Sequence, residues 1–151
     1  MECKRSRRIG KSLMDSVQID TKEVDRLAKV LGTNRDGIVR RMAFQVEGLT
    51  KELAPIEFGA LRNSTYTETS KDSGYAQASS AAKSVRADVE TIRHPVPQEG
   101  FANVGPSVNY AEFVELPGNV LKAGQRPYLT PAVEQVVQRY NNGTEWEELT
   151  K

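Results

Sequence analysis

Cysteine and histidine are nearly missing from this chain of 151 residues, which contains one of each, Cys3 and His94. A disulfide needs two cysteines, and a zinc site draws most of its ligands from cysteine and histidine, so neither is expected. Histidine-based catalysis would depend entirely on His94, which lies beside Pro95 and is expected to be a surface turn residue. The composition therefore predicts no metal, no cofactor and no enzymatic activity.

Long apolar runs and an excess of one charge are also missing. No run of about 18 apolar residues is present, so no membrane span is expected. The 21 Lys and Arg residues against 20 Asp and Glu give a net charge of +1, whereas a DNA-coating protein would be strongly basic. Residues 1–53 carry 12 basic and 8 acidic side chains, and residues 95–151 carry 4 and 7. The chain is therefore basic at one end and acidic at the other. This asymmetry of charge suits subunits that stack head to tail, although imbalances of this size also arise by chance.

The length is that of one domain. We expect a flexible basic arm over residues 1–19, a single domain over residues 20–143 and an acidic tail over residues 144–151. The arm is rich in Lys and Arg without apolar periodicity, so it is a solvated tail, a dock for an acidic partner or a phosphate contact.

Three segments have helical periodicity. Residues 21–31 carry an apolar stripe from Val24 to Leu31, and residues 33–53 carry one from Ile38 to Leu53 that stops before Pro55. A last helix is predicted after Thr130 as N-cap, with Pro131 at its first position and an end near residue 141. Residues 109–116 fit a short helical turn or a strand, and we favour the turn.

The middle of the chain favours strands. Residues 64–69 and 85–91 alternate in polarity, residues 101–108 suggest a strand broken at Gly105, and residues 70–84 are expected to be a mobile loop or hairpin tip. The predicted fold class is therefore α+β. It has two N-terminal helices, an antiparallel β-sheet with a long hairpin arm over residues 64–92, and a C-terminal helix packed on the sheet.

Two functions follow from local patterns alone. Residues 24–43 have the spacing of a helix-turn-helix, with Gly32 at the turn and Arg40 near the DNA, which makes a DNA-binding protein the main alternative. Glu112 and Glu115 form the only close acid pair in their segment, which gives a hydrolase as a weaker hypothesis.

Three blocks carry a resemblance to a known family. They are APIEFGALRNS at 54–64, NYAEFVEL at 109–116 and RPYLTPAVEQVV at 126–137. In this order and spacing they resemble the small head–tail joining, tail-completion or minor tail proteins of the neck of tailed double-stranded DNA bacteriophages. The positions singled out by this resemblance are Pro55, Gly59, Leu61, Arg62, Ser64, Tyr110, Ala111, Glu115, Arg126, Pro127, Tyr128, Leu129 and Pro131.

The resemblance implies a structural subunit of a homo-oligomeric ring, with a hexamer favoured, at the head–tail junction of a virion assembled in the bacterial cytoplasm. The implied partners are a head-closure or connector ring and a tail terminator or tail tube protein, with DNA passing non-specifically through the channel. Arg62 and Arg126 would bridge to a neighbour's carboxylate such as Glu115, or pair within the chain. Tyr128 and Leu129 would pack the last helix on the sheet or contact a neighbour.

Overall fold

The computed structural model describes residues 35–55, 59–116 and 126–143, together with Lys22, Asp25, Arg26 and Lys29, which are helical and exposed. The predicted basic arm, the acidic tail and the apolar stripe of the first predicted helix lie outside the described residues. The elements in chain order are α2 (Arg35–Leu53), α3 (Gly59–Asn63), β1 (Thr65–Thr69), α4 (Tyr75–Val85), β2 (Ala102–Pro106), α5 (Ala111–Glu115) and α6 (Leu129–Asn141).

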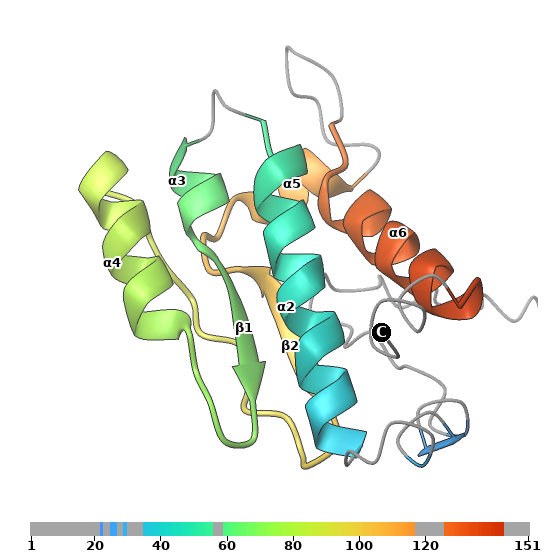
Figure 1. Cartoon of the computed structure of the whole chain (residues 1–151). Coiled ribbons are helices and arrows are strands. Elements are labelled where there is room, and N and C mark those ends of the chain that lie inside the picture. Colours follow the sequence, from blue (N-terminus) through green and yellow to red (C-terminus); the bar gives the residue numbers. More distant parts are fainter. Residues whose placement is uncertain are drawn as a thin grey trace, which may run out of the picture.

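The domain is α+β, as predicted, and helices α2 and α6 lie on one side of a two-stranded antiparallel sheet (Figure 1). Helix α2 packs on both strands and on α6. The apolar residues of α2 recur every three or four positions, so they form a continuous stripe that meets α6. The buried members of this contact are Ile38, Val39, Met42, Val46, Ala132, Val136 and Tyr140. The predicted helices 33–53 and 130–141 are thereby confirmed.

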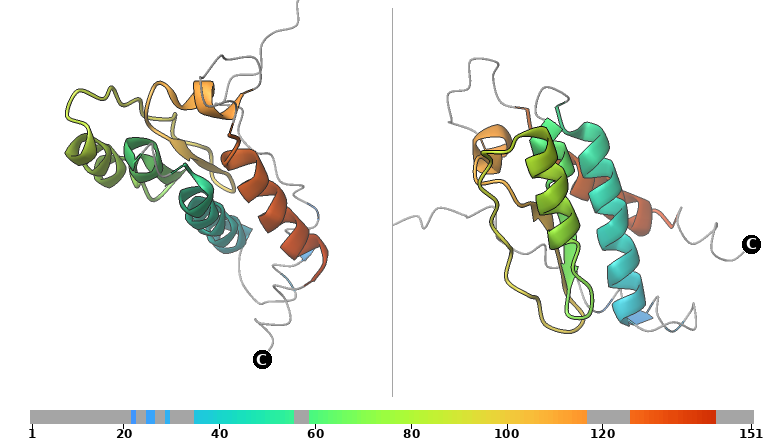
Figure 2. Two further views of the ribbon diagram at one scale, coloured as in Figure 1. Left: turned by 90° about the horizontal axis from the view of Figure 1, so that it is seen from above. Right: turned by 90° about the vertical axis from the view of Figure 1, so that its left-hand side faces the viewer.

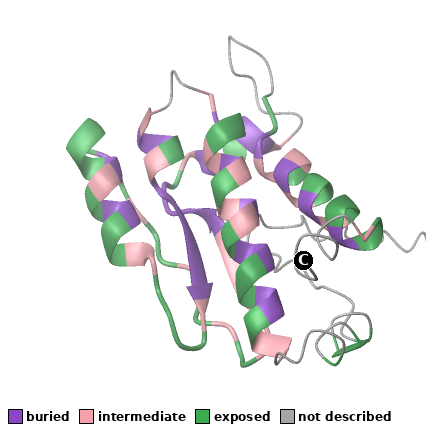
Figure 3. Cartoon of the chain, in the orientation of Figure 1, coloured by how far each residue is buried: buried purple, intermediate pink, exposed green. Residues whose placement is uncertain are grey.

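The sheet separates the two faces of the domain. Strand β1 pairs with β2 from Thr65 opposite Pro106 to Thr69 opposite Ala102, and β1 is buried along most of its length (Figure 3). Because side chains alternate along a strand, Thr67 faces α2, where its hydroxyl donates to Glu47 Oε2 at 2.7 Å. Tyr66 and Glu68 face the other way, where residues 86–98, here called the back segment, cross behind the sheet (Figure 2).

Two stacked rings lie against Gly105 in β2, where a side chain would not fit without moving them. Tyr66 lies directly opposite Gly105, and the His94 ring stacks on the Tyr66 ring with centroids 5.1 Å apart. The backbone N–H of His94 donates to the Tyr66 hydroxyl oxygen at 2.5 Å. His94 is thus half-buried, which corrects the expectation of a surface turn residue, and burial lowers its pKa.

Replacing Gly105 with alanine is expected to lower the free energy of unfolding by about 1–3 kcal/mol, the usual cost of overpacking. A Cβ at this position would lie 3.1 Å from His94 Nε2, so the stacked rings would have to move. Gly48→Ala is the matched control, since a Cβ there meets nothing within 4 Å and alanine favours the helix. Urea unfolding of both variants tests this, and equal stability of Gly105→Ala and wild type would contradict it.

Several mid-chain predictions are wrong. Residues 70–84 are not a loop or hairpin tip, because they contain most of α4, which buries Ala78, Ser79 and Ala82. The antiparallel pair is formed, but the partner of β1 is β2 and not residues 85–91, so α4 and the back segment lie between the paired strands in the sequence. Of the predicted strand 85–91, only an isolated bridge from Thr91 to Val108 is formed. Small residues four apart in 75–85 allow close helix packing, and this tertiary contact outweighs the weak local signal.

One predicted strand boundary also changes, because β2 runs through Gly105 to Pro106 without a break. Gly59, from the first sequence block, begins the short helix α3. The helical turn favoured for residues 109–116 is confirmed as α5. None of the described helices is long and apolar enough to cross a membrane.

Candidate functional site

The three sequence blocks meet in one core at one end of the domain. This end, here called the motif end, contains the end of α2, the start of α3, helix α5 and the start of α6 (Figure 1). Each block contributes to the same buried cluster, because Leu61, Val114 and Tyr128 are all at most 1% exposed. The cluster consists of Ala54, Ala60, Leu61, Ala82, Val89, Val108, Ala111, Val114 and Tyr128.

A buried carboxylate joins the second block to the third. Glu115, only 4% exposed, ends α5 and faces the first turn of α6. Its Oε2 accepts hydrogen bonds from the backbone N–H groups of Tyr128 at 2.8 Å and Leu129 at 3.0 Å. Its Oε1 accepts from the N–H of Thr130 at 2.8 Å and from the Thr130 hydroxyl at 2.5 Å. The negative charge also lies where the helix dipole favours it.

This contact corrects two predictions. Helix α6 begins at Leu129, so Thr130 is not its N-cap, and Pro131 stands at the third helical position. The N-terminal N–H groups that a capping side chain would satisfy are satisfied by Glu115 instead. The Glu115 carboxylate is therefore engaged inside its own chain, and its pairing with an arginine of a neighbouring subunit stays a prediction.

The other residues singled out by the resemblance are buried, half-buried or exposed. Ser64 is fully buried and its hydroxyl donates to the Leu61 carbonyl at 2.8 Å. Gly59 begins α3, where an added Cβ would lie 3.4 Å from Val85 Cγ1. Ala111 is buried, whereas Pro55, Tyr110, Leu129 and Pro131 are half-buried. The exposed residues are Arg62, Arg126 and Pro127.

Tyr128 belongs to the core, as the packing interpretation of Tyr128 and Leu129 predicted. Its ring is fully buried, and its hydroxyl has no hydrogen-bond partner among the described residues. Burial, assisted by the nearby Glu115 charge, raises the pKa of Tyr128. A buried hydroxyl without a hydrogen bond costs stability, so Tyr128 stabilises the core through the packing of its ring and not through its hydroxyl.

A polar network under the back segment was missed by sequence reasoning. Glu68 in β1 is 1% exposed, and it accepts from Arg93 Nη2 at 2.6 Å and from the Ser73 hydroxyl at 2.7 Å. The hydroxyls of Ser79 and Thr91 lie 2.8 Å apart beside it. The only available signal was an acid at an alternating position of a strand, which is usually solvent-exposed. These contacts fasten the back segment to the sheet.

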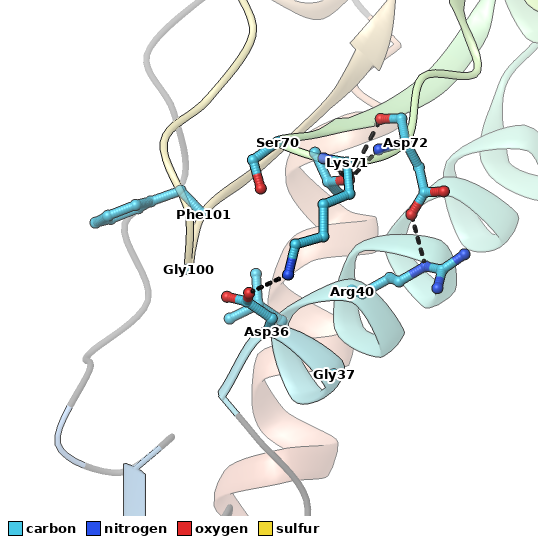
Figure 4. Close-up of a pocket in the computed structure, with 10 residues that line it drawn as sticks. Asp36, Gly37, Arg40, Ser70, Lys71, Asp72, Gly100 and Phe101 are labelled. Carbon is cyan, nitrogen blue, oxygen red and sulfur yellow. Dashed lines mark hydrogen bonds and ion pairs between the residues drawn. The ribbon is translucent and has the colours of Figure 1, made fainter.

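A hollow of about 180 Å³ lies at the opposite end of the domain (Figure 4). Its lining includes Asp36, Arg40, Lys71 and Asp72. The Lys71 ammonium bridges Asp36 Oδ2 and Glu99 Oε1, both at 3.3 Å, and Arg40 pairs with Asp72 at 3.2 Å. Surface ion pairs of this kind contribute little stability, and here they pair most of the charges that line the hollow.

The residues of the alternative functions are placed only in part. Most of residues 24–34 lie outside the described residues, and within α2 Ile38 is buried while Arg41 is exposed. Of the acid pair of the hydrolase hypothesis, Glu112 is exposed and Glu115 is buried against α6. No group of three or more His, Cys, Asp or Glu side chains suited to a metal ion occurs in the described part of the chain.

Alkaline pH is expected to destabilise the fold through Tyr66. Burial raises the pKa of Tyr66 to about 12. Because the folded state disfavours the phenolate, this contribution to stability is complete below about pH 10 and is lost as the pH rises toward about 12. Urea unfolding of Tyr66→Phe should show a smaller loss per pH unit in this window than wild type, and equal slopes would contradict the assignment.

Comparison of the chain with protein-family models, curated proteins and solved structures finds no match in any of the three.

Proposed function

We propose that this protein is a structural subunit of the neck or tail of a tailed bacteriophage. In this proposal the chain forms a homo-oligomeric ring at the head–tail junction, joins or completes the tail, and lets DNA pass. The ring contacts a head-closure or connector ring on one side and a tail terminator or tail tube protein on the other.

One observation carries the proposal. Residues 65–108 separate the first of the three blocks from the second, and residues 117–125 separate the second from the third. The buried positions of all three blocks nevertheless share one core, and Glu115 links α5 to α6 within it. Blocks that had matched the family pattern by chance would have no reason to pack together. Their convergence supports the interpretation of the pattern as one structural unit.

The surface of the motif end suits contacts with other proteins. Two large apolar side chains on the elements that meet there are exposed, Leu53 at 41% and Phe113 at 46%. Val85, which ends α4 beside Gly59, is 55% exposed. Arg62 in α3 and Arg126, just before α6, are also exposed, and arginine and aromatic residues are common in interface hot spots. We infer that this end faces a neighbouring ring.

The proposal is tested by the assembly state of the purified full chain. We expect rings in negative-stain micrographs and a matching mass by light scattering, because joining proteins work through surfaces shared between copies. A strictly monomeric chain that binds duplex DNA with sequence selectivity and a steep salt dependence would instead support the helix-turn-helix alternative over residues 24–43.

A further inference from the structure

The outward face of α2 presents a row of four exposed residues. Gly37, Arg41, Phe44 and Gly48 are spaced by four, three and four residues, so they share one face of the helix, and all are exposed. Phe44 is 48% exposed. Arg41 makes no ion pair within the described part of the chain, in contrast to Arg40, which pairs with Asp72. A Cβ at Gly48 would meet nothing within 4 Å, so this side of the helix is open.

The back segment presents a second row. Its inward residues Val89 and His94 pack on the domain, while Glu90, Ile92 and Val96 are exposed, Ile92 at 47% and Val96 at 57%. Glu90 accepts a hydrogen bond from Asn109 Nδ2 at 2.8 Å but makes no ion pair among the described residues. Two aliphatic side chains and one uncompensated carboxylate therefore share the outer surface of this segment.

Helix α2 and the back segment lie on opposite sides of the sheet (Figure 2). A single chain cannot bring them together, but two copies can. One row carries an aromatic ring and an uncompensated cation, and the other carries aliphatic side chains and an uncompensated anion. A contact between two different faces of the same chain is heterologous, which is the type that repeats around a ring.

We propose that the outer face of α2 in one copy binds the outer face of the back segment in the next copy. Phe44 packs on Ile92 and Val96, Arg41 pairs with Glu90, and Gly48 leaves room for close approach. The inference rests on the proposed ring and deepens it, since it names the surfaces through which neighbouring subunits meet.

Crosslinking between copies tests this pairing. In a Cys3→Ser background, the double variant Phe44→Cys/Val96→Cys should form a ladder of disulfide-linked oligomers under mild oxidation, ending at the size of the ring. A mixture of the two single-cysteine variants should give dimers, and each variant alone much less. Rings without crosslinks above the level of an exposed Ser80→Cys/Val96→Cys pair would overturn the inference.

Face-specific blocking gives a second test. Phe44→Asp and Val96→Asp should each abolish rings, and an equimolar mixture of the two should stop at dimers, because each variant keeps one intact face. Arg41→Glu and Glu90→Arg should each weaken assembly at least tenfold, and the double exchange should restore most of it. Failure of the double exchange to recover any assembly would contradict the ion pair.

Gly48 offers a matched control for folding. Gly48→Ala should leave assembly intact, whereas Gly48→Arg should block it, with unchanged circular dichroism in both cases because the position is open in the single chain. Rings that form normally with Gly48→Arg and Phe44→Asp would refute this interface while leaving the ring itself in place. Absence of rings from the wild-type chain would instead count against the proposed function.

Discussion

Replacing Glu115 with alanine is expected to lower the free energy of unfolding by about 4 kcal/mol and to detach the start of α6 from α5. The substitution leaves three buried or half-buried backbone N–H groups without an acceptor, and each such loss costs about 1–3 kcal/mol before water compensates. It also removes a negative charge from a helix N-terminus. Urea unfolding followed by circular dichroism measures the change.

A conservative variant at position 115 and a control at position 112 test this explanation. Glu115→Gln keeps one carbonyl acceptor but places an NH₂ group against backbone donors, so an intermediate loss of about 2 kcal/mol is expected. Glu112→Ala, three residues earlier on the same short helix, changes an exposed acid and should cost less than about 0.5 kcal/mol. Similar losses for Glu112→Ala and Glu115→Ala would show that α5, and not the contact to α6, is what the substitution disturbs.

Replacing Arg93 with methionine is expected to be the second most damaging change, with a fall in the free energy of unfolding that is measurable but smaller than that of Glu115→Ala. It removes the ion-pair partner of Glu68, whose side chain is 1% exposed, and a buried charge without a partner is strongly unfavourable. The Arg93 side chain is 49% exposed, so water reaches its place and limits the loss. Chemical unfolding of the variant gives the value.

An exposed ion pair and a double variant serve as controls for Arg93→Met. Arg86→Met breaks an ion pair with Asp88 in which both side chains are at least 60% exposed, and it should leave the free energy of unfolding nearly unchanged. The double variant Glu68→Gln/Arg93→Met should recover part of the loss, because the buried charge is removed together with its partner. No recovery in the double variant would mean that Arg93 stabilises the back segment by packing alone.

Long periodic elements were predictable from the sequence because their pattern is local. The stripe from Ile38 to Leu53 predicted α2, and the spacing of Val133, Val136 and Tyr140 predicted α6, although Val133 is only half-buried. The α+β class followed from the order of these patterns. Of the candidate site, the burial of Tyr128 agrees with the packing role that the sequence predicted for it.

The remaining features depend on partners far away in the sequence. Ser and Ala in residues 75–85 favour no structure strongly, and α4 forms because Ala78 and Ala82 find a packing surface. Glu115 caps a helix that begins 14 residues later, which no capping pattern contains. Gly105 resembled a strand breaker, yet it leaves room for the rings of Tyr66 and His94. Each of these outcomes requires knowledge of which segments meet.

Substitutions in the buried contacts and on the exposed faces are expected to have different effects. Glu115, Glu68 and Gly105 hold the fold, so their substitutions should change stability before assembly. Phe44, Arg41 and Val96 lie outside the core, so their substitutions should change assembly at constant stability. A variant set that separates in this way would assign the joining function to surfaces shared between subunits.

The most direct test of the central claim is electron microscopy of phage particles produced without this protein. The account predicts filled heads and separate tails that fail to join, with intact virions restored by the wild-type chain but not by Phe44→Asp. Intact, infectious virions in the absence of the protein would contradict it.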